Sequence, residues 1–308
     1  MKILYIDAPN TKRKYPYYTD LYKALCRKAE VSLLECSKIK NLEKFIANSK
    51  AIIIGLGWMS QKSAELYKIV GLRRYGIPII CLLHKPQNLL KHKLYFCKNN
   101  ANLLVYSQKE HAEYGKIAGI PSMQSWMGGD PKIYKDLGLD RVYDFGFSGA
   151  LHGGDKIKGA TQNLRTRIYN LLKCRTDIKL FWNGSDSIAP RIKPVREYAQ
   201  KISQTKIWLT TTGPLEDISP RYFEIGLSKT LIFCNRMDAY GDVFRDGQNC
   251  VMFNNNLSDF NTKLTHYLNA ENERQNIIEN AYTEFSTMHT WDCRAGELIS
   301  RIEQIRKG

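Results

Sequence analysis

At 308 residues the chain is long enough for two domains of ordinary size, each with its own core. Its longest apolar runs, AIIIGLG (51–57) and IPIICLL (77–83), are far shorter than the roughly 20 residues that cross a bilayer, and MKILYIDAP (1–9) is typical of a strand rather than a signal peptide. The eight cysteines have no paired spacing and no Cys/His pattern suits zinc, so we expect a cytoplasmic protein without a metal site.

The net charge of +16 is distributed unevenly along the chain. Residues 1–140 hold 23 Lys and Arg against 11 Asp and Glu, a net charge of +12. Residues 141–308 hold 23 against 19, a net charge of +4. Solubility alone does not require this asymmetry, so we expect an anionic partner for the N-terminal part of the protein.

Short apolar runs alternate with amphipathic segments along the whole chain. Buried strands that alternate with helices predict parallel sheets covered by helices on both faces. The predicted strands are 2–7, 51–57, 77–83, 102–107, 143–149, 178–184, 206–211 and 230–235; the predicted helices are 19–29, 63–76, 109–119, 162–174, 195–204, 220–228 and 291–308.

This order of elements predicts an α/β protein with two doubly wound, Rossmann-like domains that face a cleft. The first would cover residues 1–140 and the second 141–290, and 291–308 would form a terminal crossover helix that returns toward the first domain. Ligands of such domains bind at the carboxyl ends of the strands. His84 follows the strand 77–83 and is therefore a candidate for polarising an acceptor hydroxyl or binding a donor, with an ordinary loop histidine as the alternative.

Two glutamates flank one loop of the predicted second domain. In LEDISPRYFE, Glu216 lies in the loop and Glu224 lies early in a helix that Ser219 would cap and Pro220 would begin. A carboxylate accepts two hydrogen bonds side by side, which suits the neighbouring hydroxyls of a ribose or a hexose. Two carboxylates at this spacing could therefore hold two sugars of one molecule. In the alternative, Glu224 only complements the helix dipole and Glu216 is solvated.

This segment resembles the E-x7-E region of GT-B glycosyltransferases, in particular the large retaining family 4 (glycosyl transferases group 1) and its spore-coat-protein-like relatives. Glu216 and Glu224 match the two glutamates of the family, and SKTLIF (228–233) matches its turn and strand. The loop interior departs from the family, since Arg221 stands where the family is usually uncharged. Three further stretches agree with the resemblance: SQKEHAEYGKIAGIP (107–121), GGDPKIY (128–134) and FSGALHGGDKIKG (147–159).

The resemblance implies a nucleotide diphosphate sugar, linked to UDP or GDP, as substrate and no further cofactor. Glu224 would hold the ribose hydroxyls and Glu216 would approach the transferred sugar. The family has an arginine directly after the first strand of the second domain, where this chain has Ala150. The residues proposed around the donor instead are Gly149, Gly153 and Gly154, where the main chain can come close, together with His152, Lys158, Arg165 and Arg221.

The activity implied by the resemblance is transfer of a hexose from a UDP-glucose-like donor to an acceptor hydroxyl, without a metal and with retention of anomeric configuration. Glu216 and His84 would be the catalytic residues. In this fold the first domain takes the acceptor, and this is the domain that holds most of the positive charge. The acceptor-side candidates are Lys12, Arg13, Lys14 and Tyr17 of KRKYPYY, together with Trp58, Arg73 and Arg74.

Three acceptors stay open. A modified base in DNA could be flipped into the cleft while the phosphates meet the basic side chains, including the KHK of 91–93. An anionic lipid or envelope glycan could instead be reached by peripheral association with a membrane, and an ordinary glycan is the third possibility. Two other functions compete: an NDP-sugar epimerase of the same architecture, and a non-catalytic basic nucleic-acid-binding protein. Oligomeric state is not predicted.

Overall fold

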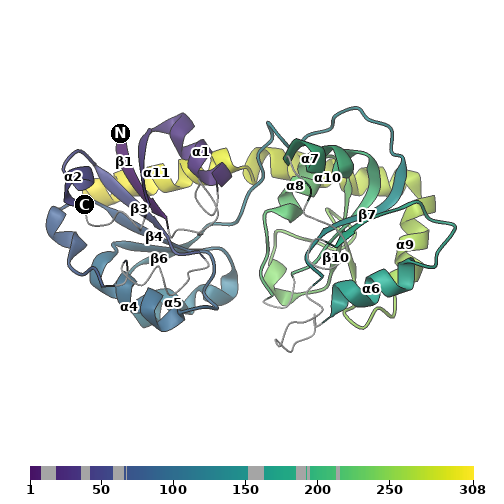
Figure 1. Cartoon of the computed structure of the whole chain (residues 1–308), viewed down its shortest axis with the longest axis horizontal. Coiled ribbons are helices and arrows are strands. Elements are labelled where there is room, and N and C mark those ends of the chain that lie inside the picture. Colours follow the sequence, from purple (N-terminus) through teal and green to yellow (C-terminus); the bar gives the residue numbers. More distant parts are fainter. Residues whose placement is uncertain are drawn as a thin grey trace. The chain divides into compact units, whose positions relative to one another are not determined.

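The computed structural model describes residues 1–7, 19–35, 42–57, 66, 68–151, 163–184, 192, 195–212 and 216–308. The chain forms two compact units, the first made of residues 1–126 and 291–308 and the second of residues 127–290 (Figure 1). The division falls earlier than the predicted residue 140, because Gly129 forms a bridge to Thr290 and lies against Leu227 of the second unit.

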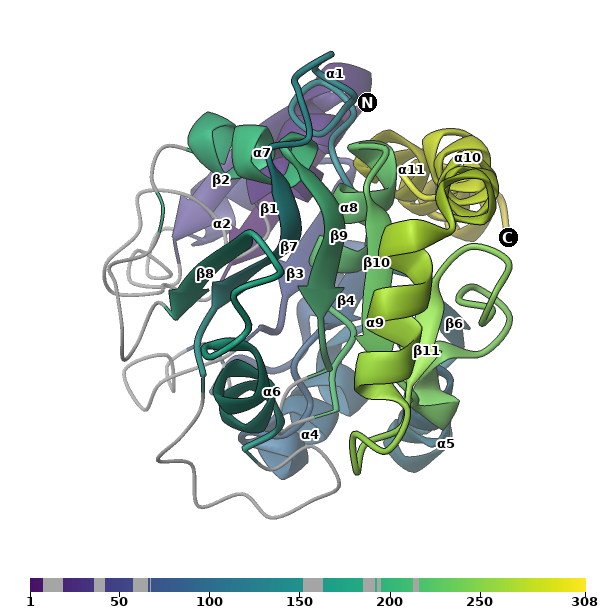
Figure 2. The same ribbon diagram turned by 90° about the vertical axis from the view of Figure 1, so that its right-hand side faces the viewer.

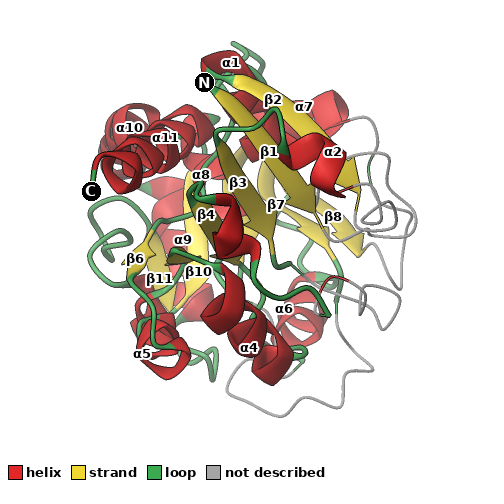
Figure 3. Ribbon diagram, turned by 90° about the vertical axis from the view of Figure 1, so that its left-hand side faces the viewer, coloured by secondary structure: helices red, strands yellow, loops and turns green. Residues whose placement is uncertain are grey.

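The first unit has a six-stranded parallel sheet in the order β2-β1-β3-β4-β5-β6. Every residue of β3 and β4 is buried, which explains why both strands are unbroken apolar runs in the sequence. Figure 3 shows β1, β3 and β4 side by side. The strands are β1 (Lys2–Asp7), β2 (Glu30–Glu35), β3 (Ala51–Gly55), β4 (Ile79–Leu83), β5 (Leu103–Tyr106) and β6 (Ser122–Gln124).

Helices cover both faces of this sheet. Apolar residues of α2, α4 and α5 pack with the strands into one continuous core, and α11 packs against α1 (Figure 1). The C-terminal helix α11 is also tied to the first unit by an ion pair between Arg27 and Asp292 (2.8 Å) and by a hydrogen bond from Ser125 Oγ to Glu297 (2.7 Å). The helical segments are α1 (Thr19–Lys28), α2 (Leu42–Ile46), η3 (Leu72–Tyr75), α4 (Leu90–Asn100), η4 (Lys109–His111), α5 (Glu113–Ala118) and α11 (Trp291–Lys307).

The second unit has a five-stranded parallel sheet in the order β11-β10-β9-β7-β8 (Figure 2). Its core is aromatic: Phe145 of β7 packs edge-on against Phe233 of β10 and Phe260 of α9. The strands are β7 (Tyr143–Gly149), β8 (Leu180–Gly184), β9 (Thr205–Thr210), β10 (Leu231–Asn235) and β11 (Val251–Phe253); the helical segments are α6 (Leu164–Leu172), α7 (Val195–Ser203), α8 (Arg221–Leu227), η5 (Asp238–Tyr240), α9 (Phe260–Asn269) and α10 (Glu271–Met288).

Two local predictions differ from the structure. The predicted helix 63–76 does not extend to its expected end: Leu66 is helical, but from Lys68 onward only η3 is, because Gly71 and Gly76 both adopt left-handed backbone angles (φ 76° and 63°). The helix predicted over 220–228 is α8, but the structure assigns its N-cap to Pro220 with no side-chain capping bond. Ser219 therefore does not cap this helix through its hydroxyl.

Candidate functional site

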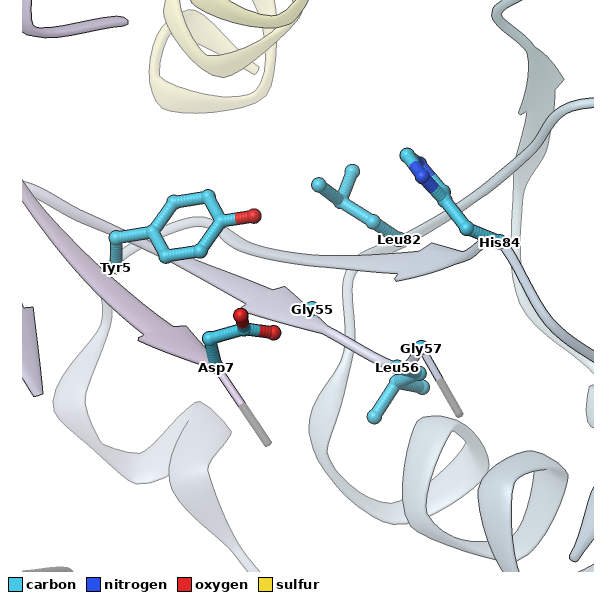
Figure 4. A pocket seen from close by; sticks show the side chains of 7 residues that line it. All are labelled: Tyr5, Asp7, Gly55, Leu56, Gly57, Leu82 and His84. Carbon is cyan, nitrogen blue, oxygen red and sulfur yellow. The ribbon is translucent and has the colours of Figure 1, made fainter. Parts of the chain in front are cut away.

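A small cavity of about 10 Å³ lies at the carboxyl edge of the first sheet. Strands β1, β3 and β4 are neighbours and run in parallel, so their last residues meet at this edge. A cavity of this size holds about one water molecule or one hydroxyl group. Figure 4 shows the residues that line it: Tyr5, Asp7, Gly55, Leu56, Gly57, Leu82 and His84.

The oxygen atoms of Tyr5 and Asp7 lie over Gly55. A methyl group at residue 55 would be 2.5 Å from Asp7 Oδ1 and 3.4 Å from Tyr5 Oη, so the absence of a side chain there makes room for both groups. Burial, and then the negative charge of Asp7, raises the pKa of Tyr5 well above its ordinary value, so the hydroxyl stays protonated and can donate. Sequence reasoning missed Asp7, although an acidic residue at the end of a buried strand was the available signal.

His84 lines the same cavity directly after β4, as expected from the end of that strand. Its side chain is buried. Burial, followed by the positive charge of Lys85, lowers the pKa of His84 from 6.5 to about 3. The imidazole is therefore neutral at physiological pH, and a neutral imidazole has one nitrogen that accepts a hydrogen bond.

Lys93 on α4 connects the two chain segments that follow β3 and β4. Its side chain is fully buried, and Nζ donates to the carbonyl oxygens of Gly57 (2.9 Å) and Lys85 (2.5 Å) and to Oδ1 of Asn88 (2.9 Å). The ammonium group thereby fixes the main chain at the pocket residue Gly57 and at Lys85, next to the pocket residue His84. The prediction that the KHK of 91–93 meets phosphates is wrong for Lys93, because its N–H groups donate inside the protein.

At the carboxyl edge of the second sheet, a guanidinium group rests on the end of β7. A methyl group at Gly149 would lie 2.6 Å from Nη1 and 3.3 Å from Cζ of Arg221, the first residue of α8. Arg221 is half-buried, and within the described part of the chain its side chain forms no hydrogen bond or ion pair. Its N–H groups are therefore available to a ligand at the end of the strand that precedes Ala150.

Arg165 lies at the same edge, but its guanidinium forms hydrogen bonds within the protein. The buried side chain donates from Nε to Thr211 Oγ1 (2.8 Å), from Nη1 to the carbonyl oxygen of Ala150 (2.7 Å) and from Nη2 to the carbonyl oxygen of Thr211 (3.1 Å). Its guanidinium also stands over the ring of Phe147 at 5.5 Å. Arg165 therefore joins the end of β7 to the end of β9 and positions the main chain there.

The two glutamates lie on either side of the start of α8. Glu224 is half-buried in the first turn of the helix, and its N–H donates to the carbonyl oxygen of Pro220 (3.0 Å). Glu216 is exposed and has φ 55°, a left-handed conformation that is uncommon for a residue with a side chain. Such conformations occur disproportionately at ligand sites.

Two of the remaining predicted residues, Arg73 and Arg74, do not join these two sites. Arg73 and Arg74 lie in η3, before β4, and therefore at the amino edge of the first sheet rather than at the edge that holds His84. Arg74 is exposed and lies 3.5 Å from Glu43. The other predicted residues lie outside the described ranges: Lys12, Arg13, Lys14, Tyr17, Trp58, His152, Gly153, Gly154 and Lys158.

The described residues contain neither a cluster of metal-binding side chains nor a helix that could span a membrane. No three or more His, Cys, Asp or Glu side chains among them are grouped so that they could hold a metal ion. None of the helices in the described ranges is both long and apolar enough to span a membrane.

Comparison with known proteins adds a family match and a shared fold. Residues 160–300 match a family model described as glycosyl transferase-like, whereas no curated protein matches the sequence significantly. The structure of Anabaena HepE in complex with UDP-glucose aligns at a TM-score of 0.62 and 13% identity, over 98% of this chain and 100% of that chain. Sucrose-phosphate synthase from Thermosynechococcus elongatus aligns at 0.66 and 11% identity, over 99% and 98% of the two chains.

A third similar structure is an alpha-glucosyltransferase in complex with UDP-glucose and DNA containing an abasic site. It aligns at a TM-score of 0.63 and 10% identity, over 98% of this chain and 99% of that chain. The predicted GT-B fold and the resemblance to glycosyltransferases are thus confirmed, with the family match located mainly in the second unit.

Proposed function

We propose that this protein is a glycosyltransferase that moves a hexose from a UDP-glucose-like donor to an acceptor hydroxyl, without a metal and with retention of configuration. The observation that carries the proposal is the guanidinium of Arg221 on Gly149. It brings to the carboxyl end of β7, where doubly wound folds bind nucleotides, a cation that pairs with no side chain among the described residues. The glycosyl transferase-like match of residues 160–300 covers the same unit and supports the same reading.

The donor site follows from this cation. An Arg guanidinium presents several N–H groups in a planar fork and suits the oxygens of a diphosphate. During transfer, negative charge accumulates on the departing UDP, and a fixed cation beside it lowers the barrier. Arg221 would fill the role of the arginine that the resembled family has directly after this strand. Glu224 would hold the ribose hydroxyls and Glu216 would approach the sugar.

The acceptor site would be the cavity at the carboxyl edge of the first sheet. Its volume of about 10 Å³ fits one hydroxyl group, and it offers a protonated Tyr5, the carboxylate of Asp7 and a neutral His84. The carboxylate of Asp7 can take the proton of the acceptor hydroxyl as the new glycosidic bond forms and UDP departs, a general-base contribution of about 10²–10⁴ in rate. The neutral imidazole of His84 can polarise the same hydroxyl by accepting a hydrogen bond from it.

The charge of the two units bears on the acceptor. The first unit holds 25 Lys and Arg against 11 Asp and Glu, a net charge of +14, whereas the second holds 21 against 19, a net charge of +2. This concentration in the first unit supports an anionic acceptor, either DNA or a membrane-associated glycan or lipid.

A donor assay tests the proposal directly. UDP release from UDP-glucose, and binding of UDP, would be measured for the native protein, Arg221→Gln and the matched control Arg196→Gln, an exposed arginine of α7. Loss of a charge-assisted contact to phosphate should weaken UDP binding by about 10-fold or more in Arg221→Gln only. Equal UDP affinity in all three proteins would refute the donor site.

The same assay separates the competing functions. UDP release that increases when duplex DNA or anionic vesicles carrying a glycan acceptor are added would identify a transferase and its acceptor class. Conversion of UDP-glucose to an isomeric sugar nucleotide would favour an epimerase. Absence of any nucleotide-sugar binding, together with salt-dependent binding of DNA, would favour a nucleic-acid-binding protein.

A further inference from the structure

A second and larger cavity of the first unit lies at the amino edge of the sheet. Its volume is about 430 Å³. Lys50 directly precedes β3, Pro78 precedes β4 and Asn102 precedes β5, so the cavity opens at the edge opposite to the one that holds His84. Its location therefore separates it from the proposed acceptor cavity.

Every charged side chain that lines this cavity is cationic. Lys50, Arg73 and Arg306 come from three segments that are far apart in the sequence. All three are exposed, and among the described residues neither Lys50 nor Arg306 forms a side-chain hydrogen bond or ion pair. The negative end of the dipole of α11 accounts for Arg306 in its last turn, but it does not account for the other two cations.

Arg73 is held in place by the protein. Its Nε and Nη2 both donate to the carbonyl oxygen of Ala101, with Nε at 3.1 Å. The turn that carries it is fixed by buried Asn100, which accepts the N–H of Leu72 (3.0 Å) and donates to the carbonyl oxygen of Ile69 (2.8 Å). These contacts leave both N–H groups of Nη1 without a partner among the described residues, so the cation is ordered before any ligand binds.

Asn102 supplies a neutral donor beside the cations. Its Oδ1 accepts the N–H of Ile79 (2.9 Å), which fixes the side-chain amide at the start of β4. Its Nδ2 donates to no group in the part of the chain that the structure describes. An oriented guanidinium, two further cations and an amide donor form a set that suits the oxygens of phosphate.

We propose that this cavity is a second ligand site, which binds the phosphate group of either an anionic phospholipid headgroup or a soluble phosphate ester. It is independent of the donor and acceptor sites proposed above. The phosphate lies between Lys50, Arg73 and Arg306, with Asn102 as a further donor. The cavity is larger than a phosphate ion needs, so it also accommodates the glycerol or other group that the phosphate is attached to.

The test compares two triple variants with the same change of net charge. The site variant carries Lys50→Gln, Arg73→Gln and Arg306→Gln. The control variant carries Lys98→Gln, Lys109→Gln and Lys116→Gln, which replace exposed lysines away from the cavity. Glycerol 3-phosphate is titrated by calorimetry at low salt, and binding to phosphatidylglycerol vesicles is measured by co-sedimentation against phosphatidylcholine vesicles. Thermal unfolding midpoints confirm that both variants are folded.

We expect the affinity of the site variant for at least one probe to decrease by about 10-fold or more, because this variant loses oriented contacts with the phosphate. The affinity of the control variant should decrease by less than about 3-fold, because only its net charge changes. Selective loss of vesicle binding would identify a lipid headgroup as the occupant. Selective loss of glycerol 3-phosphate binding would identify a soluble phosphate ester. Equal affinities of the two variants for both probes would overturn the proposal.

Discussion

Replacing the buried Lys93 by methionine tests whether its ammonium group holds the proposed acceptor cavity together. Methionine retains most of the apolar stem but removes all three hydrogen bonds. The carbonyl oxygens of Gly57 and Lys85 and Oδ1 of Asn88 would each lose a donor. An unsatisfied buried polar group costs about 1–3 kcal/mol.

The net effect is smaller than the sum of three such penalties. Burying an ammonium group is itself costly, and Lys93→Met removes that cost. Local rearrangement also lets water reach some of the freed oxygens. We therefore expect a loss of about 2–4 kcal/mol in the free energy of unfolding, which for a unit of this size lowers the unfolding midpoint by about 5–15 °C.

Thermal unfolding followed by circular dichroism measures this shift, and amide hydrogen exchange locates it. Exchange should accelerate at residues 85–88 before it does in the sheet, since these residues lose their anchor. Lys91→Met on the same helix is the matched control, because Lys91 is exposed and its side chain forms no hydrogen bond or ion pair within the described ranges. A midpoint for Lys93→Met within about 2 °C of the Lys91→Met value would refute the reasoning.

Three further predictions concern the two sites. Burial keeps His84 neutral in the folded protein, whereas the same residue in the unfolded chain takes up a proton below pH 6.5. The contribution of His84 to the free energy of unfolding is therefore fully present above pH 6.5 and decreases as the pH falls toward the pKa of about 3. Denaturant unfolding should show that the free energy of unfolding decreases by about 2–3 kcal/mol less between pH 7 and pH 4.5 in His84→Asn than in the native protein. An equal decrease in both proteins would contradict this role of His84. Gly55→Ala would place a methyl group 2.5 Å from Asp7 Oδ1, so acceptor-dependent turnover should decrease while UDP affinity stays unchanged. Turnover equal to that of the native protein would show that the acceptor does not bind in this cavity. Glu224→Gln should weaken UDP binding by about 10-fold, because it removes a charged acceptor for the ribose hydroxyls. The control Glu197→Gln, at an exposed residue, should leave UDP binding unchanged. Equal UDP affinities of the two variants would exclude Glu224 from the donor site.

The sequence predicted the elements well where one physical signal dominates. Buried parallel strands such as β3 and β4 are continuous apolar runs, and Gly119, with φ 66°, ends the helix that was expected to stop there. The helix expected over 63–76 was predicted to extend too far because its apolar spacing continues across Gly71, and spacing gives no information on backbone angle. The short strand β6 was missed because three residues are too few to show a period.

The candidate site was less predictable, because it depends on contacts between distant residues. Arg221 was predicted among the donor-binding residues although it departs from the family pattern, but its approach to Gly149 follows from the packing of α8 against the sheet and could not be predicted. In the sequence, Lys93 is one of the three basic residues of KHK and was therefore predicted to lie on the surface with the other two. Its position between Cys97 and the apolar residues at 89 and 90 on one helix face was the available sign of burial.

The topology of the first sheet also changes how the positive charge of the first unit is interpreted. Its net charge of +14 suggests a single basic surface around the acceptor. The cavity that holds His84 is instead lined by a carboxylate and by groups that are neutral, while Lys50, Arg73 and Arg306 line a cavity at the opposite edge. In a parallel sheet these edges are separated by the full length of the strands, about 15 Å for five residues. A phosphate at the amino edge would therefore share no contacts with an acceptor hydroxyl at the carboxyl edge, so the proposed anion binding by this unit is physically separable from the proposed chemistry.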